Sequence, residues 1–258
     1  MRIMWWAAAV GVALALGLAG VITARGGWDF SAYRDTDIQH QTYDRPITTL
    51  VFDEFRSGDV VVAAAEAGDA GQVVVERVVK WNGTKPAVTE TWSAGTMTVR
   101  HDCGIVIRNC SIRYTVRVPA SVAVRVEATS GDVQIGGITG PLTVHSTSGD
   151  VTLSESVAPV AVTTTSGNVS LRDVRSPQVE ANATSGDVKL SFDQAPQSVS
   201  VQTTSGNVTT SVPHDPRAYK VDVVTTSGER RISVDQSPDA GRAISVHATS
   251  GDVTIGYR

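Results

Sequence analysis

Aromatic residues, cysteine and charged residues are all scarce in this sequence of 258 residues. Aromatic side chains make up 5% of the chain, too few for a broad aromatic ligand platform. Charged residues make up 19%, and the formal net charge of −4 leaves no excess of basic groups for phosphates. No P-loop, dinucleotide-binding glycine pattern or His-Glu-x-x-His motif occurs. We therefore expect no nucleic-acid partner and no cofactor.

The sequence is instead rich in Thr, Ser and Val, a composition typical of β-strands, and its 41% hydrophobic content is enough for a core. Before the β-rich body, residues 3–22 form an uncharged apolar run long enough to cross a bilayer as a helix. The alternative is a cleaved signal peptide, whose apolar region is shorter and ends in a small-x-small site. We expect an uncleaved, single-pass membrane anchor, with the C-terminal body extracytoplasmic.

Cys103 and Cys110 are the only cysteines in the sequence. In an oxidising compartment two nearby cysteines usually pair, so we expect a disulfide between them. A metal site that combines both thiols with His101 and Asp102 is the alternative, although zinc motifs place their cysteines closer together.

The strongest pattern is an internal repeat, Thr-Ser-Gly followed by an acidic residue or Asn, at intervals of 18 to 23 residues. Apolar residues stand seven and five positions before each glycine, and small residues stand three positions before it. After most of the glycines, apolar residues follow at the second and fourth positions. This alternation predicts a strand, a corner and a second strand in each unit. The predicted structural corners are Gly131–Asp132, Gly149–Asp150, Gly167–Asn168, Gly186–Asp187, Gly206–Asn207, Gly228–Glu229 and Gly251–Asp252.

Such units, stacked in sequence order, predict an all-β parallel β-solenoid in which identical residues form inward columns about 4.8 Å apart. Glycine permits a positive φ at the corner, and Asp and Asn bond neighbouring backbone amides in turns. Arg230 stands where the other units have Val, so we expect local distortion or a slipped register in the sixth unit. Ser57-Gly58-Asp59-Val60 is an early echo of the corner.

The domain organisation follows from these patterns. We expect an N-terminal transmembrane anchor in residues 1–27 and a linker in residues 28–46. Residues 47–120 contain strand-like runs without the regular repeat, and we expect irregular coils there that cap the solenoid and carry the disulfide. Residues 121–258 form the regular repeat solenoid.

The anchor, the segment Tyr43-Asp44-Arg45-Pro46, the two cysteines before residues 114–119 and the serial TSGDV/TSGNV corners resemble a bacterial putative-adhesin family of unknown function with β-strand repeats. The similarity is to membrane-anchored members of actinobacterial type. This resemblance implies a β-solenoid that faces the cell wall or the exterior. It does not imply an activity.

Several polar residues of the repeat allow a catalytic or metal-binding role as an alternative to a structural one. Asp132 and Asp150 on adjacent coils would have the carboxylate separation of a retaining glycosidase, but every coil has such a residue for its turn. Calcium could bind stacked acidic corners, although one oxygen ligand per coil is sparse. His145 and His247 occupy one outward column five coils apart, too far to share a metal. Ser148, His145 and Asp150 crowd one turn and cannot form a triad.

We therefore expect a non-enzymatic, adhesin-like or envelope-interaction protein without cofactors, whose partners are the membrane and a cell-wall polymer or an envelope protein. Two alternatives stay open. The first is a polysaccharide-active β-helix enzyme with a cleft of convergent acids near residues 214–217 or 235–242. The second is an envelope-stress regulator that acts through a partner.

Overall fold

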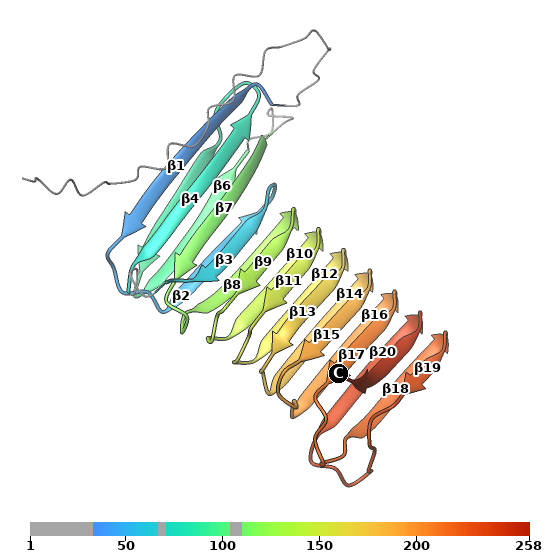
Figure 1. Cartoon of the computed structure of the whole chain (residues 1–258). Helices are drawn as coiled ribbons and strands as arrows, with labels where there is room; N and C mark the ends of the chain where they lie inside the picture. The colour runs from blue at the N-terminus through green and yellow to red at the C-terminus, as the bar shows by residue number, and fades with distance from the viewer. Residues whose placement is uncertain (1–32, 67–70, 104–109) are drawn as a thin grey trace, which may run out of the picture. The chain divides into compact units, whose positions relative to one another are not determined.

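The computed structural model describes residues 33–66, 71–103 and 110–258, and in them the chain forms strands and no helix (Figure 1). The all-β prediction is confirmed for this part of the chain. None of the described segments is a helix that could span a membrane. The predicted transmembrane residues 3–22 lie outside the described residues.

Within the described residues the strands form two sheets that face each other. The first sheet has ten strands, in the spatial order β18 (Lys220–Ser227), β20 (Ala243–Ser250), β16 (Ser198–Ser205), β14 (Gln178–Ser185), β12 (Val160–Ser166), β10 (Leu142–Ser148), β8 (Ala123–Ser130), β2 (Thr49–Phe55), β6 (Thr96–Asp102) and β5 (Ala87–Ser93). The second sheet has eleven strands, in the order β1 (Asp35–Tyr43), β4 (Val73–Trp81), β7 (Cys110–Val118), β3 (Val60–Ala64), β9 (Val133–Gly136), β11 (Val151–Ser154), β13 (Val169–Val174), β15 (Val188–Phe192), β17 (Val208–Val212), β21 (Val253–Tyr257) and β19 (Arg230–Ile232).

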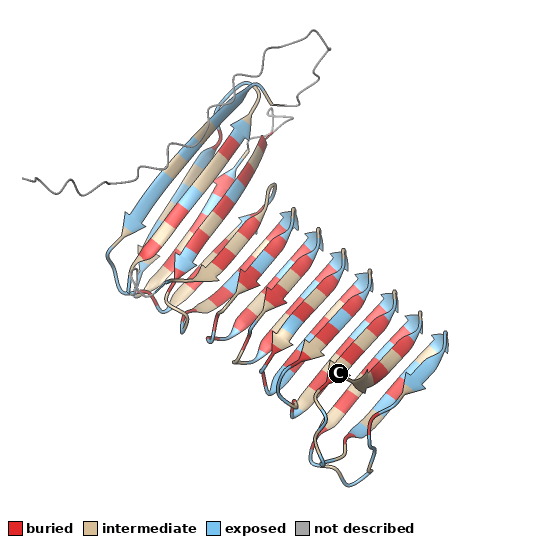
Figure 2. Ribbon diagram, in the orientation of Figure 1, coloured by how far each residue is buried: buried red, intermediate tan, exposed pale blue. Residues whose placement is uncertain are grey.

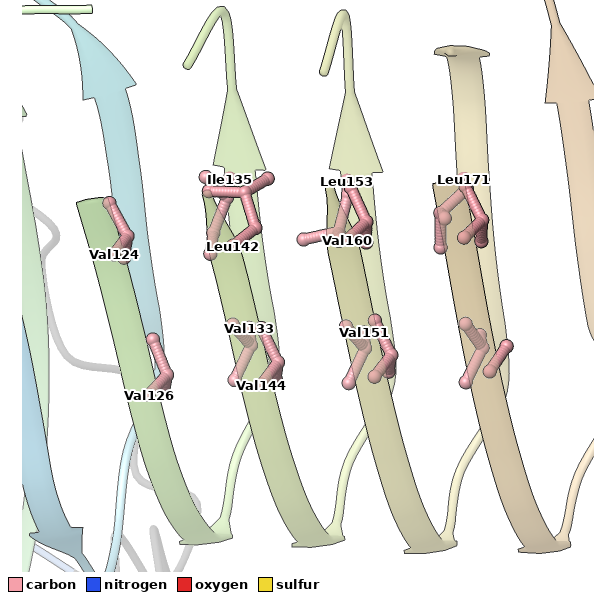
Figure 3. Packing of buried hydrophobic residues seen from close by; sticks show 14 of the residues in the cluster. Val124, Val126, Val133, Ile135, Leu142, Val144, Val151, Leu153, Val160 and Leu171 are labelled. Carbon is pink, nitrogen blue, oxygen red and sulfur yellow. The ribbon is translucent and has the colours of Figure 1, made fainter. Parts of the chain in front are cut away.

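Each repeat forms one coil, with a strand in the ten-stranded sheet, a glycine corner and a strand in the eleven-stranded sheet. Neighbouring coils pair in parallel and in register, so that Leu142 lies between Val124 and Val160, and Leu153 lies between Ile135 and Leu171. Figure 3 shows these side chains filling the space between the sheets. Like residues therefore pack on like residues along the solenoid, as the repeat predicts.

Burial alternates along the strands, with inward residues buried and outward residues exposed or intermediate (Figure 2). The pattern in β12 is typical, since Val160 and Val162 are buried while Thr163 is exposed. Several buried positions are polar instead, among them Ser146, Thr164 and Thr203 in the ten-stranded sheet. Thr210 stands in the column of Leu190 and Ile255 and is fully buried.

The corner glycines stack directly on one another. Their φ angles lie between 112° and 144°, a region that L-residues rarely adopt. A Cβ atom on Gly149 would lie 2.1 Å from the carbonyl oxygen of Gly131, and the other corner glycines have contacts of 2.0 to 2.2 Å. Both conformation and space therefore require glycine at each of these corners. Gly58 occupies the same column, below Gly131.

The order of the last two coils differs from the sequence order. The coil of β20 and β21, with Gly251, lies between the coil of Gly206 and the coil of Gly228. The expectation of stacking in sequence order is therefore wrong at this end. Both inserted strands pair in parallel with their two neighbours, so the insertion leaves the columns continuous.

This order explains Arg230. Its coil forms the C-terminal end of the described solenoid, where the inward position no longer faces a further coil. The expected slip in register does not occur, because Arg230 pairs with Val253 and Ile232 pairs with Ile255. The Arg230 guanidinium donates a hydrogen bond to the carbonyl of Val223 at 3.1 Å. An inward charge on a short edge strand is a common protection against edge-to-edge pairing.

At the N-terminal end the chain also stacks out of sequence order. The coil of β6 and β7 lies outside the coil of β2 and β3 and pairs with it in parallel. The strands β1, β4 and β5 then extend the two sheets in antiparallel fashion. Part of the expected linker, residues 35–43, is thus the edge strand β1, whose mainly exposed residues lack the apolar alternation that would have predicted a strand.

Replacement of a corner glycine tests the stacking constraint. We expect Gly149→Ala to destabilise the protein by about 3 kcal/mol or more, because the new Cβ meets a backbone carbonyl and the backbone is strained. The matched control is Gly83→Ala, which has a positive φ but open space and should cost about 1 kcal/mol. Equal denaturation midpoints for the two variants would contradict close corner packing.

Arg230 allows a test of end protection. We expect Arg230→Val to associate with itself as concentration rises, because an apolar residue at the end of the core leaves an unprotected edge. The control is Arg231→Val, which removes the same charge from the outward neighbour. Sedimentation velocity over a range of concentrations separates the variants, and a monomeric Arg230→Val would contradict the protective role.

Candidate functional site

The acidic and amide side chains after the corner glycines form a continuous hydrogen-bonded ladder. In each step the Oδ1 atom of one Asp or Asn accepts a hydrogen bond from the backbone N–H of the equivalent residue in the next coil, at 2.8 to 3.2 Å. The ladder runs through Asp59, Asp132, Asp150, Asn168, Asp187, Asn207, Asp252 and Glu229.

The ladder also shows how like charges are separated. Asn168 donates from Nδ2 to Asp150 Oδ1 at 3.2 Å, so the amide bonds the preceding carboxylate instead of repelling it. At the N-terminal end, Arg113 donates to Asp59 through Nη2 at 2.7 Å. The corner residues thus hold neighbouring coils together.

This geometry bears on the catalytic and metal hypotheses. The Oδ1 atoms of Asp132 and Asp150 are occupied by backbone N–H groups of the next coil, as in every other step of the ladder. In the described part of the chain no three His, Cys, Asp or Glu residues gather closely enough to hold a metal ion. His145 and His247 lie four coils apart rather than the predicted five, because the coil of Gly228 does not lie between them. Asp132 and Asp150 thus bond to the next coil through their carboxylates, and the two histidines lie too far apart to share a metal ion.

The outer face of the ten-stranded sheet carries a groove beside the corners. One section holds about 530 Å³ and extends from Thr163 in β12 to Val224 and Thr226 in β18. The other holds about 650 Å³ and extends from Glu54 in β2 to Thr165 in β12. Thr163 lines both sections, so we treat them as one feature, the outer groove. Eight coils contribute to it, which at about 4.8 Å per coil gives a length of about 34 Å.

Two outward columns form the walls of the outer groove, and the small column between them forms its floor. One wall contains, in spatial order, Arg56, Thr129, Thr147, Thr165, Thr184, Thr204, Thr249 and Thr226. The other wall contains Glu54, Glu127, His145, Thr163, Asn182, Gln202, His247 and Val224. The floor is made of Ala, Ser and Thr, so no large side chain fills the groove.

The outer groove is not uniform along its length. Glu54, Glu127 and Arg56 place charges at its N-terminal end, whereas Asn182 and Gln202 make the central part neutral and amide-rich. At the other end Val224 is 51% exposed. The hydroxyl, amide and imidazole groups of the outer groove can donate and accept hydrogen bonds with a polar ligand.

The predicted disulfide Cys103–Cys110 is present in the structure, where it joins the ends of β6 and β7. His101, two residues before Cys103, is buried. The His101 ring packs against the ring of Phe55, with 4.3 Å between the ring centroids. Its Nε2 accepts a hydrogen bond from the backbone N–H of Ser57 at 3.2 Å. Burial, and then the positive charge of Arg56, lower the pKa of His101 to about 4. Its role is therefore packing, and both sulfurs of the alternative metal site are consumed by the disulfide.

A buried polar cluster closes the N-terminal end of the core and was not foreseen from the sequence. Glu90, from the ten-stranded sheet, accepts hydrogen bonds from the hydroxyls of Tyr43 and Tyr114, which belong to the other sheet. Arg77 Nη1 lies 3.1 Å from Glu90 Oε1. Burial, and then Glu90, raise the pKa of Tyr43 to about 12, so its hydroxyl stays a donor. The cluster links the two sheets where the regular repeat is missing.

The loop of residues 214–217, one of the two proposed for an enzymatic cleft, holds its acidic residue in ion pairs. Asp215 binds Arg217 and lies beside Arg242, and His214 packs against Tyr257 at 4.7 Å between ring centroids. The Asp215 carboxylate of this region is therefore held by two guanidinium groups.

These features define a two-sheet parallel β-solenoid with a polar surface groove. A family model described as Toastrack DUF4097 matches residues 57–256, and the chain belongs to this family. Among curated proteins none matches the sequence.

Solved structures with a similar fold include a putative adhesin from Bacteroides fragilis, with 13% identity and a TM-score of 0.46, covering 86% of this chain and 97% of that one. A putative cell adhesion protein from Clostridium sporogenes has 10% identity and a TM-score of 0.32, covering 86% and 100%. A putative lipid binding protein from Parabacteroides distasonis has 9% identity and a TM-score of 0.33, covering 86% and 97%. At these values none of them informs on the ligand of this chain.

The buried histidine generates a pH prediction. Because the pKa of His101 falls from 6.5 to about 4 on folding, the unfolded chain binds more protons between these values, and the free energy of unfolding should rise with pH across that window. Urea denaturation at several pH values measures this slope, which His101→Gln should reduce. His145→Gln, at an exposed histidine, is the control, and equal slopes for wild type and His101→Gln would contradict the assignment.

Proposed function

We propose that this protein is a non-catalytic binding module of the cell envelope, and that the outer groove holds an extended, polar polymer of the wall. The observation that carries the proposal is the groove itself, one wall of which repeats a Thr hydroxyl on seven successive coils, over about 29 Å. A ligand with repeated hydroxyl or amide groups matches such a surface, because each coil offers similar donors and acceptors.

Affinity in this arrangement is a sum of weak contacts. Thr hydroxyls on the wall are exposed to water, so each hydrogen bond to a ligand adds little net free energy. Contacts made on successive coils become intramolecular after the first, which raises the overall affinity. Binding should therefore increase with polymer length until the ligand spans the groove.

A non-catalytic role is supported by the bonds that the acidic residues make. The corner carboxylates accept backbone hydrogen bonds between coils, and Asp215 is bound by arginine.

The envelope location is supported by the apolar run of residues 3–22 and by the disulfide, since disulfides persist in oxidising compartments. We propose that this run anchors the body outside the membrane, and retention of the full chain in carbonate-washed membranes tests it.

The groove is tested with the full chain in detergent and an insoluble wall polysaccharide. We expect the double variant Thr184→Arg and Thr204→Arg, which narrows the central groove on adjacent coils, to lose at least tenfold in affinity. The matched control is Thr209→Arg with Thr254→Arg, on adjacent coils of the opposite sheet. Co-sedimentation measures both.

Equal binding by the two double variants would overturn the assignment of the groove. Release of soluble sugar from the polysaccharide by the wild-type protein would overturn the non-catalytic role. Saturation with short oligosaccharides at the same affinity as the polymer would contradict the summed-contact mechanism.

A further inference from the structure

A second, separate pocket lies among the loops of the C-terminal coils. It holds about 350 Å³, and its lining includes Arg217, Ala218, Ser237, Ala240 and Arg242. Three connections contribute to it. Gln197 lies between β15 and β16, residues 217–218 lie between β17 and β18, and residues 237–242 lie between β19 and β20. The outer groove, by contrast, is lined by strand residues of the ten-stranded sheet.

Arg242 is the unusual member of this pocket. The residue is only 6% exposed, and its guanidinium lies over the buried ring of Tyr219 at 5.8 Å from the centroid. Its Nη1 atom is 3.2 Å from Asp215 Oδ1. Its Nε atom is buried and has no hydrogen-bond partner among the described residues. A buried guanidinium donor without an acceptor is costly, because it has lost water without replacement.

Asp215 is bound mainly by Arg217. Arg217 donates to it from Nε at 3.2 Å, from Nη2 at 3.3 Å and from the backbone N–H at 2.9 Å. These bonds, led by the Arg217 side chain, hold the pKa of Asp215 well below its usual range, so the carboxylate stays charged. Two guanidinium groups thus share the one carboxylate of Asp215.

We propose that this pocket binds the oxyanion of a small ligand, a carboxylate or a phosphate group, between Arg217 and Arg242. The planar guanidinium presents several N–H donors in one plane, which suits the paired oxygens of such groups. Ala218 and Ala240 give the pocket an apolar wall that accommodates a small apolar substituent next to the oxyanion. Ser237 adds a hydroxyl at its rim.

Three probes distinguish the sources of the oxyanion: N-acetylalanine, inorganic phosphate and N-acetylalanine amide, which lacks the carboxylate. They are titrated into the full chain in detergent at constant ionic strength, with the Arg242 Nε–H signal followed by NMR. We expect saturable shifts of this signal with one or both anions and none with the amide.

Variants assign the binding to these residues. Arg217→Gln, at a side chain that is 68% exposed, should weaken anion binding at least tenfold without unfolding the protein. Arg242→Lys keeps the positive charge but loses the planar set of N–H donors, and it should weaken anion binding further. Arg231→Gln removes an exposed positive charge from the terminal coil and is the control, with affinity unchanged.

Saturation by phosphate alone or by carboxylate alone supports the site and identifies the source. Shifts that stay linear for both anions would overturn the proposal, as would equal affinity in wild type and Arg217→Gln. If Arg242→Lys does not fold, the Arg217→Gln titration decides. Loss of polymer binding at the outer groove leaves this test unaffected, because the two sites share no residue.

Discussion

The close contact between stacked corner glycines is the constraint on which the rest of the structure depends. Each corner backbone lies against the carbonyl of the coil below, at a distance that no Cβ tolerates. This contact fixes the corners in one line, and the fixed line sets the register of the strands on both sides. The inward columns, the ladder of Asp and Asn and the walls of the outer groove are all consequences of that register.

Much of this could be predicted from the sequence, because a two-residue alternation around a fixed glycine defines which residues share a column. Val124, Leu142 and Val160 are equivalent by position alone, and they stack as expected. The spatial order of the coils could not be predicted in this way. The unit of Gly251 matches its neighbours as well as the unit of Gly228 does, so the pattern is the same in either order. Arg230 indicates the order of the last two coils, because a charged residue in an inward column is tolerated at the end of the solenoid.

The candidate sites also differ in how far the sequence predicts them. The outer groove follows from the repeat, because the Thr before each corner Ser recurs in every regular unit. The polar cluster around Glu90 and the pocket at Arg242 depend on residues that only tertiary structure brings together. Glu90 accepts hydrogen bonds from Tyr43 and Tyr114 across the two sheets, and no pattern in the sequence indicates that these residues lie close together. Sites built by repetition are therefore visible in a sequence, whereas sites built by irregular ends are not.

The insertion of one coil between two earlier ones has a consequence for assembly. Folding of a solenoid can nucleate in any turn and propagate to the neighbouring turns. The strands β18 and β19, however, find their ladder partners only in β20 and β21, which are synthesised after them. The final pairing of residues 220–232 therefore requires residues 243–257 to be in place. Propagation in sequence order can reach β17, and the last two turns can be completed only together.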